Sequence, residues 1–148
     1  TLLSRWLPLL ACMTLIFAVS MDRNPYRDLP SGFSQPVQTA ANSIAKAIVG
    51  HPVNEQELLG QPGHVIEYAL LALAAANALI WMHKPTAGAL TLTFIACVLY
   101  ALSDEIHQIF VPGRAFEIAD LVLDAAGIFT GLLLYWGIRS RLERRKIL

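Results

Sequence analysis

The chain of 148 residues is 55% hydrophobic and 15% charged, and its formal net charge is zero. A soluble domain has about a quarter charged residues, so this composition argues against an ordinary soluble enzyme. It also excludes a disordered chain, a disulfide scaffold and a nucleic-acid binder with a basic surface. A transmembrane helix needs about 20 apolar residues, so the hydrophobic share is enough for roughly four spans.

Four charge-poor blocks predict transmembrane helices at about residues 3–21, 64–82, 86–104 and 117–138. Their apolar runs are continuous and do not alternate with period two, which indicates helices and not barrel strands. The first block also resembles a secretory signal peptide ending near Ser20, but three spans follow it and we expect it to remain as a helix. The sequence therefore predicts an all-α integral membrane protein, a four-transmembrane-helix bundle forming one domain over residues 1–148.

Lysine and arginine flank the predicted spans unevenly, and cytoplasmic flanks normally have the excess. The side with both chain ends and the second connection has seven basic residues, and the other side has four. We therefore predict a multi-pass protein with cytoplasmic termini, in which residues 22–63 and 104–117 face outward. The seven are Arg5, Lys84, Arg139, Arg141, Arg144, Arg145 and Lys146, and the four are Arg23, Arg27, Lys46 and Arg114.

The long outer loop contains one segment with helical spacing, from Val37 to Ile48, between Pro36 and Gly50. Such a short amphipathic helix lies either on the outer membrane face or across the end of the bundle as a packing element. The segment has one lysine and no arginine to attract anionic lipid, which favours the packing role.

Polar side chains gather at the outer ends of three predicted spans. Topology alone brings these ends to one level of the bundle, so we expect the side chains to converge there. They are His64 and Glu67 in the second span, Tyr100, Asp104, Glu105, His107 and Gln108 in the third, and Glu117, Asp120 and Asp124 in the fourth.

The fourth span has Gly127 and Gly131 on the same helical face as Asp120 and Asp124. Small residues let helices approach closely, so this face is predicted to pack inside the bundle with the two acids buried. Asp124 is expected about 9 Å below the membrane surface, at a cost of about 2.5–3.5 kcal/mol unless it is paired. Its candidate partners are Arg114, His107 and His64.

The connection after the third span ends in Pro112, Gly113 and Arg114. Proline followed by glycine indicates a turn, which is expected to fold Arg114 back over the acids. There, the planar guanidinium would hold a carboxylate or a phosphate through two hydrogen bonds.

The run Ser103–Arg114, followed by Asp120 and Gly127, resembles the signature of the VanZ-like membrane proteins, and residues 64–71 resemble that family's preceding block. The resemblance covers roughly residues 60–135. Two positions depart from it: Gly60-Gln61 stands where the family commonly has Asp-Lys, and Asp124 where it commonly has Asn. The resemblance implies a bacterial cytoplasmic-membrane protein. The founding member is associated with low-level resistance to teicoplanin, a glycopeptide that acts on cell-wall precursors outside the membrane.

Three roles for the polar residues remain open. The first is a structural network that fixes helix register, and the second is a small accessory subunit of a larger membrane complex. The third is a site for an anionic envelope component such as a lipid phosphate, either as a binding site or as a metal-assisted enzyme acting on a lipid-linked substrate. The expected partners are accordingly membrane lipid, a cell-wall precursor or glycopeptide, or a membrane protein, and not nucleic acid.

Candidate roles follow for each side chain in the third case. Arg114, Gln108 and Tyr100 are candidates for anion binding, and His64, Glu67, Asp104, Glu105 and His107 for acid–base catalysis. No cofactor is predicted outright, but two histidines with carboxylates suit Zn²⁺, and the acids alone suit Mg²⁺ or Ca²⁺. The candidate metal ligands are His64, Asp104 and His107, with no fixed-spacing motif to support them.

Overall fold

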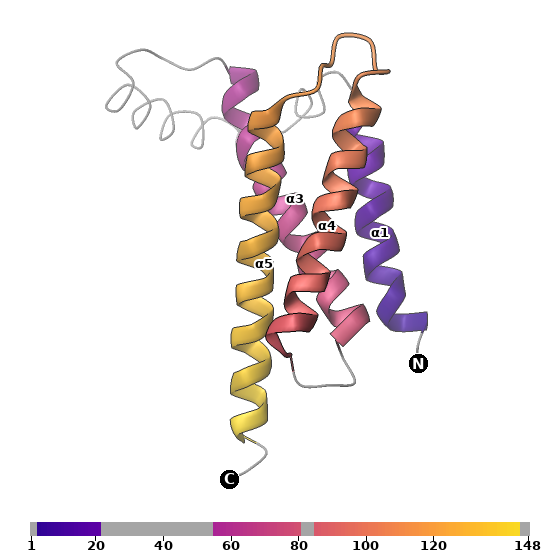
Figure 1. The fold of residues 1–148 in the computed structure, drawn as a ribbon. Coiled ribbons are helices and arrows are strands. Elements are labelled where there is room, and N and C mark those ends of the chain that lie inside the picture. The colour runs from indigo at the N-terminus through magenta and orange to yellow at the C-terminus, as the bar shows by residue number, and fades with distance from the viewer. Residues whose placement is uncertain (1–2, 22–54, 81–84, 146–148) are drawn as a thin grey trace, which may run out of the picture.

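The computed structural model describes residues 3–21, 55–80 and 85–145, which form an all-helical bundle (Figure 1). Four helices run side by side: α1 (Leu3–Ser20), α3 (Glu55–Ile80), α4 (Ala87–Gln108) and α5 (Ile118–Arg145). The short helix expected between Val37 and Ile48 lies outside the described residues. The prediction of an all-α fold is confirmed.

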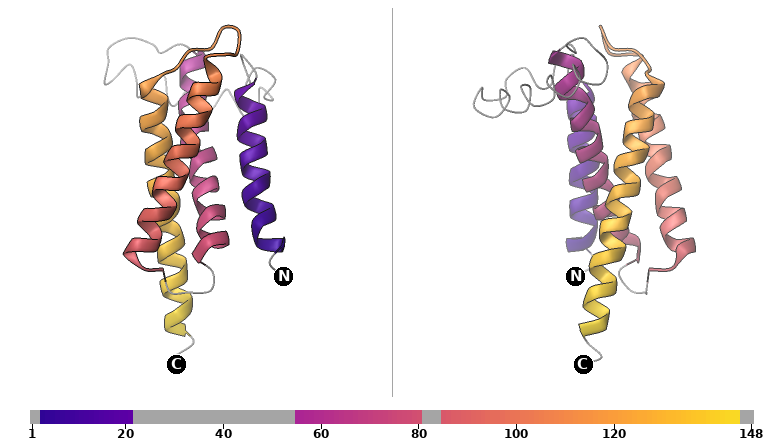
Figure 2. Two further views of the ribbon diagram at one scale, coloured as in Figure 1. Left: turned by 45° about the vertical axis from the view of Figure 1, so that its right-hand side comes forward. Right: turned by 90° about the vertical axis from the view of Figure 1, so that its left-hand side faces the viewer.

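Helix α3 is the centre of the bundle, because it contacts each of the other three helices and α5 most extensively (Figure 2). Its buried face is rich in alanine, which lets neighbouring backbones come close. Larger side chains fill the remaining core, among them Tyr68 and Leu71 from α3 and Ile128 and Leu132 from α5.

The contact between α3 and α5 depends on two glycines. A Cβ atom on Gly127 would collide with the carbonyl oxygen of Val65, and one on Gly131 with that of Ala69. The backbones are therefore too close for any side chain at these positions, and this close approach sets the position of α5 against α3 beside the polar residues.

The bundle has polar side chains in its interior and large apolar ones on its outside. Ser20, Thr93, Asp104, Glu105, Gln108 and Asp124 are buried. Three helical segments are long and apolar enough to cross a membrane, namely Gly63–Ile80, Ala87–Gln108 and Ile118–Arg145. The described part of α1 is apolar but shorter. Membrane-spanning helices are thus supported, and the count of four spans stays a prediction. Exposed apolar side chains include Leu7, Leu15, Leu92, Leu99, Phe129 and Trp136.

Helix bounds differ from the predicted spans where polar residues continue a helix. Helix α3 already begins at Glu55, α4 continues to Gln108, and α5 reaches Arg145. The spans were placed on charge-free runs, whereas α4 and α5 continue through Glu, Gln and Arg, which favour helix, and α3 includes Gly60 and Pro62 against their propensity.

The two ends of the bundle differ in charge. The end of α1, the start of α3, the end of α4 and the start of α5 lie together at one end (Figure 1), which we name the polar end. The start of α1 and the end of α5 lie at the opposite end. We name that opposite end the basic end, because the last turns of α5 hold Arg139, Arg141, Arg144 and Arg145.

Candidate functional site

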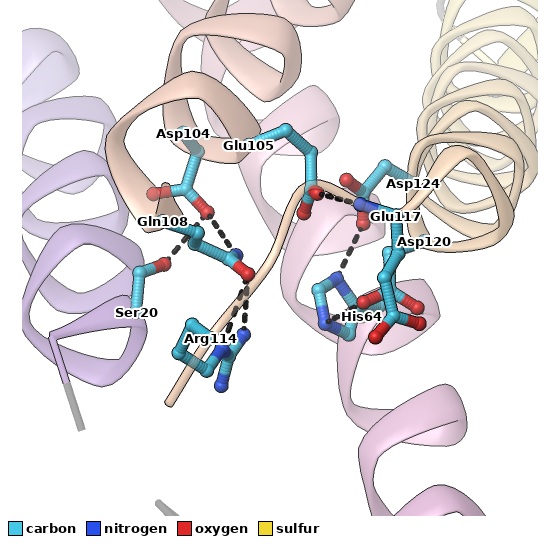
Figure 3. Close-up of polar contacts among 9 residues, drawn as sticks. All are labelled: Ser20, His64, Asp104, Glu105, Gln108, Arg114, Glu117, Asp120 and Asp124. Atoms are coloured by element: carbon cyan, nitrogen blue, oxygen red, sulfur yellow. Dashed lines mark hydrogen bonds and ion pairs between the residues drawn. The ribbon is translucent and has the colours of Figure 1, made fainter. Parts of the chain in front are cut away.

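Two groups of polar side chains occupy the polar end (Figure 3). The first, the Arg114 network, consists of Ser20, Asp104, Gln108 and Arg114. The second, the His64 cluster, consists of His64, Glu105, Asp120 and Asp124. Successive residues of α4 belong to different groups: Asp104 to the Arg114 network and Glu105 to the His64 cluster.

The Arg114 network is a continuous hydrogen-bonded chain. Ser20 Oγ donates to Asp104 Oδ2 at 2.6 Å, and Gln108 Nε2 donates to the same oxygen at 3.3 Å. Arg114 donates to Gln108 Oε1 twice, through Nε at 3.1 Å and through Nη2 at 2.8 Å. Asp104 and Gln108 are both buried and lie one helical turn apart. These hydrogen bonds therefore link the Arg114 guanidinium to side chains buried inside the bundle and fix its orientation.

The connection between α4 and α5 contains the predicted turn. Gly113 has a φ of 85°, a conformation that favours glycine, and the Arg114 N–H donates to the Val111 carbonyl at 3.1 Å. Further along, the Glu117 N–H donates to Glu105 Oε2 at 3.0 Å. The turn directs Arg114 toward Gln108, whose amide oxygen accepts two hydrogen bonds from the guanidinium, whereas the predicted partner was a carboxylate or a phosphate.

The same connection exposes apolar side chains at the polar end. The exposed fractions are 56% for Ile109, 78% for Phe110 and 37% for Phe116. Apolar side chains on both sides of an arginine are typical of a segment lying at the membrane–water interface. Exposed apolar side chains thus flank Arg114 on the same connection.

The His64 cluster joins α3 to α5. His64 Nδ1 lies 2.8 Å from Asp124 Oδ1, and His64 Nε2 lies 3.6 Å from Asp120 Oδ2. An ionised carboxylate only accepts hydrogen bonds, so Nδ1 is the donor toward Asp124, while Nε2 faces Asp120. Of the candidate partners for Asp124, His64 is the one that reaches it through this hydrogen bond.

Glu105 brings α4 into the His64 cluster. Its side chain is fully buried, and Oε1 has no hydrogen-bond partner among the described residues. His64, Glu105 and Asp120 each offer one ligand atom, and these atoms lie within 4.8 Å of one another. The three residues have the donor types and the spacing to hold a divalent metal ion.

This trio differs from the expected metal ligands His64, Asp104 and His107. Asp104 bonds Ser20 of α1, and the His107 ring packs on Phe17 of α1 with ring centroids 4.5 Å apart. Successive helical residues point about 100° apart, so Glu105 faces α3 and α5 where Asp104 faces α1.

Two other candidates have different surroundings. The Tyr100 hydroxyl donates to the Met13 carbonyl at 2.6 Å, so this side chain ties α4 to α1. Glu67 lies one turn after His64 on α3 and is partly buried. Sequence reasoning missed Ser20 as a site residue, since it was read only as the end of a resemblance to a signal peptide. Its polar side chain at the end of an apolar helix was the available signal.

An apolar groove of about 400 Å³ lies between α4 and α5 in the other half of the bundle. Its walls come from the first turns of α4 and the middle of α5, so it does not continue the polar-end site. The lining residues are Leu90, Thr91, Phe94, Phe129, Leu132, Leu133 and Trp136.

Comparison with known proteins gives one family. A family model described as VanZ/LLP1 matches residues 6–139, which is most of the chain. Neither the curated proteins nor the solved structures gave a match.

Proposed function

The chain belongs to the VanZ/LLP1 family, and we propose that it binds the phosphate-bearing headgroup of an envelope lipid at the polar end, on the outer side of the bacterial cytoplasmic membrane. The observation that carries the proposal is the Arg114 network. It fixes a guanidinium at the end of a membrane bundle through a chain of buried side chains.

The geometry of the network favours anion binding. Gln108 Oε1 accepts two hydrogen bonds from Arg114, and these fix the plane of the guanidinium. An oriented planar guanidinium matches the oxygens of a phosphate group. Burying the polar side chains of Asp104 and Gln108 has a desolvation cost, and a bundle stabilised by apolar packing alone does not require it.

The surroundings of Arg114 favour a lipid as the source of the phosphate. Ile109, Phe110 and Phe116 are exposed on the same connection and would lie among acyl chains and headgroups. A lipid phosphate would then reach Arg114 without leaving the interface.

The proposed orientation follows from charge. The basic end of α5 would be cytoplasmic by the positive-inside rule, which directs the polar end outward. Cell-wall precursors are lipid-linked phosphates on that side, and glycopeptides such as teicoplanin act on them there. The proposal therefore includes such a precursor, or its glycopeptide complex, as a partner.

The test uses the protein purified in detergent and titrated with phosphatidylglycerol or, as a control, zwitterionic phosphatidylcholine. Phosphatidylglycerol should raise the thermal unfolding midpoint, since a ligand at 100 times its Kd stabilises by about 2.7 kcal/mol. Arg114→Gln should lose this shift. Arg141→Gln, an exposed arginine at the basic end, is the matched control and should keep it.

Two results would contradict the proposal. One is an equal phosphatidylglycerol shift in wild type and Arg114→Gln, which would leave the network a structural role. The other is an equal loss in Arg141→Gln, which would indicate general attraction of anionic lipid to basic residues. If Arg114→Gln does not fold, Arg114→Lys replaces it, because it keeps the charge but loses the planar fork.

A further inference from the structure

Three helices each supply one ligand-type atom at the polar end. His64 comes from α3, Glu105 from α4 and Asp120 from α5, and the ligand atoms lie within 4.8 Å of one another (Figure 3). Tetrahedral ligands about 2.0–2.1 Å from Zn²⁺ are separated by about 3.3 Å. His64 Nε2 and Asp120 Oδ2 are already 3.6 Å apart, so these two atoms need only a small adjustment.

Two buried carboxylates of the His64 cluster each have one oxygen that accepts no hydrogen bond from the described residues. Glu105 Oε1 and Asp124 Oδ2 have no hydrogen-bond partner among the described residues, and their side chains are 0% and 1% exposed. A buried carboxylate oxygen without a donor is unfavourable unless a cation approaches it or the carboxyl is protonated. Glu105 therefore gives an observation, separate from the spacing, that points to a bound cation.

His64 is also held as metal-ligating histidines are held. Its Nδ1 meets Asp124 Oδ1 at 2.8 Å, which fixes the ring and the tautomer and turns Nε2 toward Asp120. A carboxylate bonded to the second ring nitrogen is the usual support of a metal-bound histidine, and it raises the basicity of the ligand. Asp124 is thus a positioning residue for His64.

From these three observations we infer that the His64 cluster is a divalent metal site with His64, Glu105 and Asp120 as protein ligands. One imidazole with two carboxylates suits Zn²⁺ better than Mg²⁺ or Ca²⁺, which prefer oxygen ligands alone. Three protein ligands leave a fourth position for water or a substrate oxygen. The site does not depend on the proposed binding of a lipid phosphate.

The test measures Zn²⁺ binding to the full protein, purified in detergent with any affinity tag removed and stripped with a chelator. Titration calorimetry and elemental analysis give the affinity and the stoichiometry, and Mg²⁺ is titrated for comparison. Wild type should bind one equivalent of Zn²⁺ and bind Mg²⁺ more weakly. Co²⁺ in place of Zn²⁺ should give the visible absorption of a four-coordinate site.

Matched variants locate the ion. His64→Ala, Glu105→Gln and Asp120→Asn should each weaken Zn²⁺ binding more than tenfold. The controls are His107→Ala, a histidine packed against α1, and Glu117→Gln, an exposed acid at the same end, and both should bind as wild type does. Glu105→Gln changes charge at nearly constant shape, which protects the fold.

Three results would overturn the inference. The first is a folded wild type without a stoichiometric Zn²⁺ ion, a result that needs no variant. The second is equal affinity in wild type and Glu105→Gln. The third is an equal loss of affinity in the two controls, which would assign the ion to other residues. None of these results affects the phosphatidylglycerol test, so the two proposals fail separately.

Discussion

His64 Nδ1 lies 2.8 Å from Asp124 Oδ1, so an imidazole at the polar end of α3 is bonded to an acid buried in α5. The contact lies beside the place where Gly127 brings the two helices together at Val65. This close packing of α5 on α3 thus supports the polar contact, and the polar contact offsets the cost of burying Asp124.

Substitution of Asp124 should separate stability from ion binding. Asp124→Asn keeps an oxygen that accepts from His64, so the free energy of unfolding should change by less than about 1 kcal/mol. Asp124→Ala leaves the His64 donor unsatisfied and should cost about 1–3 kcal/mol. Zn²⁺ affinity should fall about 10–100-fold in Asp124→Asn, because the support of His64 is weakened. Unchanged Zn²⁺ affinity in Asp124→Asn would contradict the positioning role.

Alanine at the close-contact glycines should destabilise the bundle. The new Cβ at Gly127 or Gly131 meets a backbone carbonyl that cannot rotate away, so each change should cost about 1–3 kcal/mol. Gly137→Ala on the same helix is the control, since its Cβ meets nothing within 4 Å and should be neutral or stabilising by up to about 1 kcal/mol. Thermal unfolding in detergent measures all three. Equal midpoints for Gly131→Ala and Gly137→Ala would refute the close approach of α5 to α3.

Ser20→Ala should weaken the attachment of α1 while leaving ion binding unchanged. It removes the hydrogen bond to Asp104, and hydrogen bonds to charged groups are worth about 1.5–3 kcal/mol. Ser103→Ala is the control, because that exposed hydroxyl donates only to the Tyr100 carbonyl of its own helix. Zn²⁺ affinity should be equal in Ser20→Ala and wild type, since Ser20 belongs to the Arg114 network. A large loss of Zn²⁺ affinity would show that the two groups are not independent.

The proposed orientation predicts labelling from outside the cell. Phe110 is 78% exposed at the polar end, and Arg145 is exposed at the basic end. After Cys12 and Cys97 are replaced by alanine, a membrane-impermeant maleimide should label Phe110→Cys in intact cells but not Arg145→Cys. Both should react once the cells are lysed. Labelling of Arg145→Cys alone in intact cells would reverse the orientation.

Hydropathy and charge predicted much of the fold, but they predicted little of which polar side chains contact one another. The apolar blocks predicted the helices, since burial of a backbone in lipid leaves few alternatives to helix. The facing of Asp120 and Asp124 into the bundle followed from their register with Gly127 and Gly131. The blocks also indicated which helix ends meet, because connections between successive spans alternate sides.

The rotation of each helix about its axis was beyond the sequence pattern. Asp104 and Glu105 are adjacent acids, and only packing decides that the first faces Ser20 and the second faces His64. A rotation of one residue exchanges their roles, so the expected metal ligands included Asp104 in place of Glu105. The hydrogen bonds from Arg114 to the Gln108 amide were equally hidden, since a carboxylate or a phosphate is the usual bidentate partner of a guanidinium.

Lipid binding at Arg114 is tested most directly by the lipid that the protein retains after purification from bacterial membranes, measured by native mass spectrometry. Wild type and Arg141→Gln should retain an anionic phospholipid or a lipid-linked phosphate, and Arg114→Gln should lose it. Equal lipid retention by Arg114→Gln and wild type would contradict lipid binding at Arg114.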